Sequence, residues 1–131
     1  MPTDKIVQKT VIPAAPSLVY EAFVDGQKHA AFSHSPASSE ESVGGQFSAW
    51  DGYISGRYLE LEPGKRIVAE WQTTEWPPGY PPSRLELVFA PAGTGTEITM
   101  THTGVPTDQK DSYAQGWEDF YWKPLRQYFK R

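Results

Sequence analysis

The final twenty residues, SYAQGWEDFYWKPLRQYFKR, constrain the fold more than any other stretch of the chain. At 100° per residue, their large rings fall on one side of a helix and their charged residues on the other, so we expect one long helix that opens at Thr107 and Asp108. The apolar side comprises Tyr113, Trp117, Phe120, Tyr121, Pro124 and Tyr128, widened by Trp122, Leu125 and Phe129. Such a helix must bury that side against another layer of secondary structure.

Pro124 lies inside this predicted helix. A proline costs roughly 3 kcal/mol in a helix interior. Each buried ring contributes about 4–6 kcal/mol as an upper estimate. Two or three buried rings therefore outweigh the proline, and we expect the helix to continue past Pro124 with a kink.

The layer that covers the helix is predicted by the stretch from Glu40 onward. Four glycine-containing turn signals occur there, at Gly44-Gly45, Asp51-Gly52, Pro63-Gly64 and Gly93-Thr94-Gly95. The turns separate five segments, QFSAW, YISGRYLELE, KRIVAEWQTTEW, SRLELVFA and TEITMTHTGV. The last segment alternates with a period of two, so that Ile98, Met100 and His102 share one buried face. Strands joined by short turns predict an antiparallel meander.

The first forty residues add a strand and two helices. KIVQKTVI is typical of a strand, and APSLVYEAFVD is typical of a helix that Ser17 caps and Gly26 ends. Its buried face would carry Val19, Ala22 and Phe23, and QKHAAFSHS would form a second, short helix. The WPPGYPPS segment is too rich in proline to pair in a sheet, so we expect a loop at one end of it.

Together these elements predict an α+β fold of one domain over residues 1–131. Its order is a strand, two helices, five or six strands and a long helix. An antiparallel sheet of about six to seven strands would curve around the C-terminal helix.

Composition excludes several kinds of function. The chain has 131 residues, a net charge of −4 and a pI of about 5.3, which argue against nucleic acid or an anionic membrane as a partner. It contains no cysteine, so disulfides, thiol catalysis and thiolate metal sites are excluded. We find no signal-peptide pattern and no apolar run long enough to span a bilayer, so the expected location is the cytoplasm.

Several segments resemble a known family. The opening segment KTVIPAAPSLVYEAFVD is similar to START-like (SRPBCC) domains. The Aha-type branch, which comprises the activator of heat-shock-protein-90 ATPase and stand-alone bacterial relatives, resembles the chain at DGYISGRYLELEPGKRIVAEW, WPPGYPPS, GTEITMTHTGVP and GWEDFYWKPLRQYF. The resemblance runs from Ile6 to Phe129 and implies a helix-grip fold.

In the wider superfamily, the space between sheet and helix holds apolar ligands such as lipids, sterols, plant hormones and polyketides. Some relatives are cyclases or dehydratases. In the two-domain chaperone activator this module is the C-terminal half. The N-terminal half, which carries much of the chaperone contact, has no counterpart in these 131 residues, which weakens the expectation that this chain stimulates a chaperone by itself.

The histidines offer few candidates for chemistry. We expect His29 and His34 to be surface or rim residues beside the second helix, and no metal site or other cofactor is predicted. His102 should point inward, either as a core residue hydrogen-bonded to a neighbouring backbone group or tyrosine, or as a group that orients a ligand or donates a proton.

Aromatic residues give the strongest signal of a binding site. Trp71, Trp76, Tyr80, Tyr113, Trp117 and Tyr121 are expected to meet near the proline-rich loop, either as a filled core or as the wall of a cavity. The predicted ligand-binding residues are Phe23, Phe32, Trp71, Trp76, Met100, His102, Tyr113, Trp117 and Tyr121.

These observations lead to three hypotheses about function. The first is binding of a small hydrophobic or amphipathic molecule, such as a lipid, between sheet and helix. The second is a co-chaperone-like module in the stress response, with a filled interior and an exposed apolar patch at Trp50 or Trp76. The third is a cyclase or dehydratase, for which His102 is the only acid–base candidate.

Overall fold

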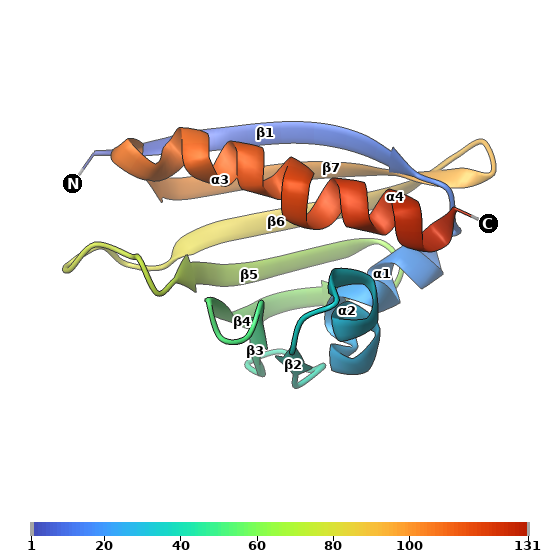
Figure 1. The fold of residues 1–131 in the computed structure, drawn as a ribbon, viewed down its shortest axis with the longest axis horizontal. Coiled ribbons are helices and arrows are strands. Elements are labelled where there is room, and N and C mark those ends of the chain that lie inside the picture. Colours follow the sequence, from blue (N-terminus) through green and yellow to red (C-terminus); the bar gives the residue numbers. More distant parts are fainter. Residues whose placement is uncertain (1, 131) are drawn as a thin grey trace.

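A computed structural model describes residues 2–130 and shows one antiparallel sheet with a long C-terminal helix across its concave face (Figure 1). The seven strands lie in the order β1-β7-β6-β5-β4-β3-β2. They are β1 (Thr3–Ile12), β2 (Ser38–Ser39), β3 (Gln46–Ala49), β4 (Ile54–Glu62), β5 (Arg66–Thr73), β6 (Ser83–Ala92) and β7 (Gly95–Pro106). This arrangement confirms the α+β, helix-grip fold, and the sequence had indicated every strand except the two-residue β2.

Two short helices, α1 (Pro16–Val24) and α2 (Gly26–Ser33), lie together at one end of the sheet (Figure 1). The prediction that Ser17 caps α1 is wrong, because Ala15 occupies the cap position and Pro16 begins the helix. Gly26 also does not end α1. Asp25 separates the two helices, and its carboxylate accepts hydrogen bonds from the backbone of Gln27 at 2.9 Å and Lys28 at 3.1 Å.

The C-terminal helix is continuous but not uniform. It comprises a 3₁₀ turn η1 (Thr107–Gln109), α3 (Lys110–Trp117), a π-helical turn η2 (Glu118–Trp122) and α4 (Lys123–Phe129). In η2 the backbone N–H of Lys123 bonds to the carbonyl of Glu118, five residues earlier. The turn ends two residues before Pro124, whose nitrogen has no hydrogen to donate to a backbone carbonyl.

The wider turn changes which rings face the sheet. Tyr121 and Trp122 are both buried, whereas Phe120 is 51% exposed. The expectation that Phe120 belongs to the buried side is therefore wrong, because a π-turn adds one residue to the helical repeat. Trp122 now stacks on Trp117, with ring centroids 5.4 Å apart and planes inclined by 21°.

Gln8 of β1 fixes the helix to the sheet at two points. Its amide nitrogen donates to the carbonyl of Ala114 at 3.0 Å, and its amide oxygen accepts from the indole nitrogen of Trp122 at 2.7 Å. We call this pair of bonds the Gln8 bridge. It sets both the height and the rotation of the helix above the concave face.

No helix within residues 2–130 is both long and apolar enough to cross a membrane.

Candidate functional site

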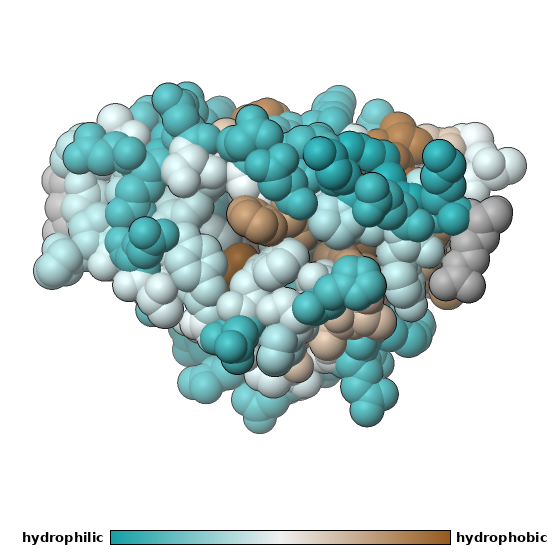
Figure 2. All heavy atoms as spheres, in the orientation of Figure 1, coloured by the Kyte–Doolittle hydropathy of each residue, from teal (hydrophilic) through white to brown (hydrophobic). Residues whose placement is uncertain are grey.

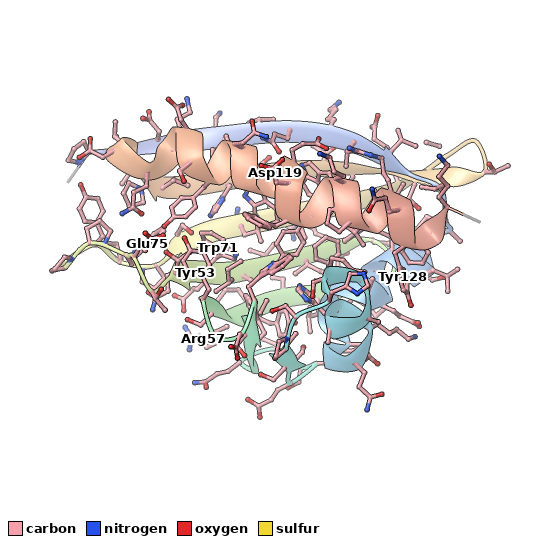
Figure 3. All side chains as sticks on the ribbon, in the orientation of Figure 1. Tyr53, Arg57, Trp71, Glu75, Asp119 and Tyr128 are labelled. Atoms are coloured by element: carbon pink, nitrogen blue, oxygen red, sulfur yellow. The ribbon has the colours of Figure 1, made fainter. Side chains whose placement is uncertain are left out.

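The rings that the sequence analysis grouped together meet beneath the helix, around Trp71 of β5. The centroid of Trp71 lies 5.9 Å from Trp117, 5.3 Å from Tyr113 and 6.1 Å from Trp76. Figure 3 shows Trp71 in the space under the helix, with Tyr53 and Glu75 beside it. Because strand and helix supply opposite sides of this cluster, it lies at the interface between the two layers.

Tyr121 extends the cluster toward α1 and α2. Its ring lies 4.8 Å from Trp117, stacks on Phe23 at 5.7 Å and is tilted against Phe32 at 5.9 Å. Tyr80 has no ring contact with the cluster, and its hydroxyl points to the carbonyl of Pro2 at 3.4 Å. The prediction that these rings come together therefore holds for all of them but Tyr80.

Two cavities border this cluster. The first has a volume of about 40 Å³ and is lined by Phe23, His29, Ser38, Ser39, Phe47, Ser48, Ala49, Tyr58, Ile67, Ala69, Trp71, Leu85, Leu87, Trp117 and Tyr121. The second measures about 70 Å³ and is lined by Tyr53, Ile54, Trp71, Ser112, Tyr113, Gly116, Trp117, Phe120 and Tyr121. The two cavities share Trp71, Trp117 and Tyr121, so these three rings form the wall between them.

Four of the predicted ligand-binding residues line neither cavity. Phe32 and Trp76 lie behind the rings that do, and Met100 and His102 are fully buried in the core.

Figure 2 shows hydrophobic atoms reaching the surface in the groove below the C-terminal helix. The second cavity opens beside Phe120, which is half exposed.

His102 points inward as predicted, with no exposed surface. The indole nitrogen of Trp117 donates to its Nδ1 at 3.2 Å, so the neutral imidazole carries its hydrogen on Nε2. That hydrogen is donated to the Ser83 hydroxyl at 2.7 Å, which in turn donates to the carbonyl of Trp71 at 2.6 Å. Burial lowers the pKa of His102 to about 3. With both nitrogens bonded and no charge, His102 offers no free acid–base group for catalysis.

His29 differs from its predicted place. It is 6% exposed rather than a rim residue, whereas His34 is exposed as expected. Its Nε2 shares a hydrogen bond of 3.0 Å with the hydroxyl of Tyr121, and its ring lies 4.7 Å from Phe32. The spacing of three residues between His29 and Phe32 places both on one face of α2 and was the signal that the sequence analysis missed.

The environment of His29 leaves one of its nitrogens unused. Burial lowers the pKa of His29 to about 4, with a small opposing contribution from its own backbone carbonyl. Nδ1 nevertheless forms no hydrogen bond, and that carbonyl already accepts from the Ser33 hydroxyl at 2.7 Å. Burial also raises the pKa of Tyr121, so the pair remains uncharged at neutral pH.

Trp50 closes the site from the side of β3. Its backbone has φ = 55° and that of Asp51 has φ = 57°, a left-handed conformation that is strained for a bulky residue. Its ring packs edge-on against Phe120 at 5.0 Å, and its indole nitrogen is buried without a hydrogen-bond partner. Trp50 and Trp76 are both half-buried, so neither forms the exposed patch expected for a module with a filled interior.

A polar rim surrounds the cluster at the proline-rich loop. The Tyr53 hydroxyl donates to Glu75, and the Tyr113 hydroxyl bonds to Thr73 at 2.6 Å and to Gln109 at 2.7 Å. Burial and the bond to Glu75 raise the pKa of Tyr53. Within residues 2–130, no three histidine or carboxylate side chains are grouped so that they could hold a metal ion.

Sequence comparison assigns the chain to a family. The family described as Activator of Hsp90 ATPase homolog 1-like protein matches residues 13–130. The chain belongs to this family. The match to this activator-like family covers every helix of the fold and every strand except β1.

Related proteins and structures agree with membership of the activator-like family. The human protein named Activator of 90 kDa heat shock protein ATPase homolog 1 is 33% identical over 129 residues, 98% of this chain. The chain spans only 38% of the human protein's length. A relative from Dictyostelium discoideum with a similar name is 32% identical over 123 residues and is matched over 32% of its length.

A solved HSP90 activator from Plasmodium falciparum superimposes with a TM-score of 0.77 at 23% identity, covering 91% of this chain and 89% of that one. At this identity, the structural likeness shows the fold alone.

Proposed function

We propose that this protein binds a small, largely apolar molecule between the concave face of the sheet and the C-terminal helix. The observation that supports this function is the pair of cavities, about 40 and 70 Å³, that meet on Trp71, Trp117 and Tyr121. Protein interiors are close-packed and contain few voids larger than a water molecule. Two voids at one place therefore indicate a region where the core is incomplete without a further molecule.

The chemistry of the lining favours an uncharged ligand. None of the residues that line the two cavities is Asp, Glu, Lys or Arg. Ligand pockets are typically lined by apolar and aromatic side chains, with a few polar groups that fix orientation. The lining also carries hydroxyl groups of serine and tyrosine, and His29 is the lining residue with a buried polar atom that has no hydrogen-bond partner.

The volumes set the size of the ligand. A cavity of about 150 Å³ is large enough for benzene. Neither cavity reaches that volume, nor do the two together, so a one-ring ligand binds only when rotation of Trp117 or Tyr121 both joins and enlarges them. Trp117 and Tyr121 would then act as a movable wall.

An NMR titration tests this proposal. The purified protein, labelled with ¹⁵N, is titrated with a panel of one- and two-ring apolar compounds and short lipids. We expect saturable shifts at Trp71, Tyr113, Trp117 and Tyr121, and weaker binding by Ala69→Leu, which fills the first cavity. A well-folded protein that shows no saturable shift with any compound would contradict the proposal.

A second candidate function is suggested by the comparisons alone. The curated relatives are named as activators of the 90 kDa heat shock protein ATPase, and one of them is 33% identical to this chain. Docking on an HSP90-class chaperone would use the outside of the domain. We therefore expect Ala69→Leu to leave chaperone binding and ATPase stimulation unchanged if that function is present. An ATPase assay with and without the chain separates the two functions.

A further inference from the structure

Around Tyr121 there are more buried hydrogen-bond donors than acceptors that they reach. A neutral His29 and Tyr121 carry two polar hydrogens between them, one on the imidazole and one on the phenol, and they share a single bond of 3.0 Å. If the phenol donates to Nε2, the Nδ1 hydrogen is unused, since Nδ1 has no partner. If Nε2 donates, the phenol hydrogen is unused. Either tautomer therefore leaves one buried donor without an acceptor.

Trp50 adds a second unused donor at the same place. An indole nitrogen can only donate, and Nε1 of Trp50 is buried without a partner. The Trp50 ring lies 6.5 Å from that of Tyr121. Its N–H opposes the rise in the pKa of the Tyr121 phenol as a weak hydrogen bond does, but the two groups do not reach full hydrogen-bond geometry. A buried polar hydrogen without an acceptor costs about 1–3 kcal/mol, and such groups are rare in folded proteins.

The donor of the His29–Tyr121 pair adjoins the cavities. His29 and Tyr121 line the first cavity, and Tyr121 also lines the second. His29 is more than nine-tenths buried, so bulk water does not satisfy its free nitrogen. The loop that carries Trp50 has a strained backbone, and its ring rests on the half-exposed Phe120. Trp50 itself lines neither cavity, but it packs on Phe120 and Tyr121, which do, so a shift of its loop would bring its N–H to the cavity wall.

We propose that the bound molecule carries a neutral carbonyl group whose oxygen accepts hydrogen bonds from Trp50 and from the His29–Tyr121 pair. This inference rests on the proposed function and names the class of its ligand. A carbonyl oxygen has two acceptor lone pairs and brings no hydrogen of its own, which matches two donors that lack acceptors. A hydroxyl group would add a third donor. A carboxylate would be buried without a cation, since neither cavity is lined by Lys or Arg.

The test compares acetophenone with ethylbenzene, which have nearly the same shape and differ in the carbonyl oxygen. Dissociation constants are measured by NMR titration of the full chain. We expect acetophenone to bind about three- to tenfold more tightly, the ratio that corresponds to one or two net hydrogen bonds. Trp50→Phe and Tyr121→Phe should each reduce this ratio toward one, because ethylbenzene makes no hydrogen bond that either change removes.

Tyr58→Phe is the matched control. Tyr58 also lines the first cavity, but its hydroxyl pairs at 2.7 Å with that of the half-buried Ser39, where water can accept the remaining hydrogen. This variant should keep the wild-type ratio.

Equal affinities for the two probes, or a ratio that neither variant changes, would overturn the carbonyl assignment while leaving apolar binding intact. Absence of binding by both probes to a folded protein would overturn the assignment together with the proposed function. Trp50→Phe retains an aromatic ring against Phe120, so it serves as the decisive variant if Tyr121→Phe does not fold.

Discussion

The indole nitrogen of Trp117 donates a hydrogen bond to Nδ1 of His102 across 3.2 Å in the middle of the core. This bond determines the tautomer of His102, and it links the helix to β7 at the level where the aromatic cluster is densest. The network continues through Ser83 to the backbone of β5. His102, a candidate for catalysis in the sequence, is thus part of a network that connects α3, β7, β6 and β5.

Replacing His102 by Ala should lower the free energy of unfolding by about 2–4 kcal/mol, because the change creates a cavity and leaves the Trp117 N–H unpaired. Urea unfolding followed by tryptophan fluorescence measures the effect. His34→Ala is the control, since His34 is exposed and should change stability by less than about 0.5 kcal/mol. Equal effects of the two substitutions would contradict the network described here.

The two buried histidines should make stability depend on pH. Burial lowers their pKa values to about 4 for His29 and about 3 for His102, against 6.5 in the unfolded chain. Above pH 6.5 both are neutral in both states. Below it the unfolded state binds protons that the folded state does not, so stability falls as the pH decreases from 6.5 to about 4. Each histidine should account for about 2 kcal/mol between pH 6.5 and pH 5.

Unfolding curves at pH 7, 6 and 5 measure this dependence, and His102→Gln provides the comparison. The variant removes one titrating group, so its stability should fall less steeply over the same range. A variant that loses stability as steeply as the wild type would show that His102 does not remain neutral in the folded protein.

Gln8→Ala should loosen the C-terminal helix. The change removes the Gln8 bridge and leaves the Ala114 carbonyl and the Trp122 indole without their partner, at a cost of about 1–3 kcal/mol. We expect faster amide hydrogen exchange throughout α3 and η2 and little change in β4 and β5. Lys9→Ala, an exposed neighbour on the same strand, should leave exchange in the helix as it is.

Gly116→Ala should raise the stability of the protein and weaken its binding of apolar compounds. Gly116 lies inside α3, and an added Cβ would approach only the Phe120 ring, at 3.6 Å. Alanine is favoured over glycine in a helix by about 0.5–1 kcal/mol, so the melting temperature should rise. Because Gly116 lines the second cavity, the same change should weaken binding of apolar compounds.

Gly56→Ala is the contrasting substitution. There the added Cβ would lie 1.9 Å from the Glu70 carbonyl and 2.6 Å from the Phe47 ring, so the strand pairing must shift and stability should fall. Thermal melts of both variants provide the comparison. A Gly56→Ala protein as stable as wild type would contradict the close approach of β4 and β5.

Most of the fold could be read from the sequence because its signals are local. Glycine turns and alternating residues specify strands such as β5 and β7 without reference to the rest of the chain. The π-turn could not be read in this way. Helical periodicity assumes 3.6 residues per turn, and only the packing of Tyr121 and Trp122 against the sheet reveals the extra residue.

The candidate site was predicted only in part, for a similar reason. Trp71, Tyr113 and Trp117 were identified because large rings on two facing layers must meet. His29 was missed because polarity alone suggested the surface, while its burial depends on Tyr121, 92 residues away. The position of the Trp50 ring depends on a left-handed backbone at Trp50 and Asp51. The nearby Gly52 indicates a turn in the sequence but does not specify this conformation.

The Gln8 bridge also bears on how the chain acquires its structure during synthesis. Gln8 emerges from the ribosome 106 residues before Ala114 and 114 residues before Trp122. Strand β1 pairs with β7, so its hydrogen-bonding partner is late as well. Contacts between such distant segments form slowly. Until β7 and the C-terminal helix have been synthesised, β1 therefore remains an unpaired strand, and its free backbone groups can pair with those of another chain.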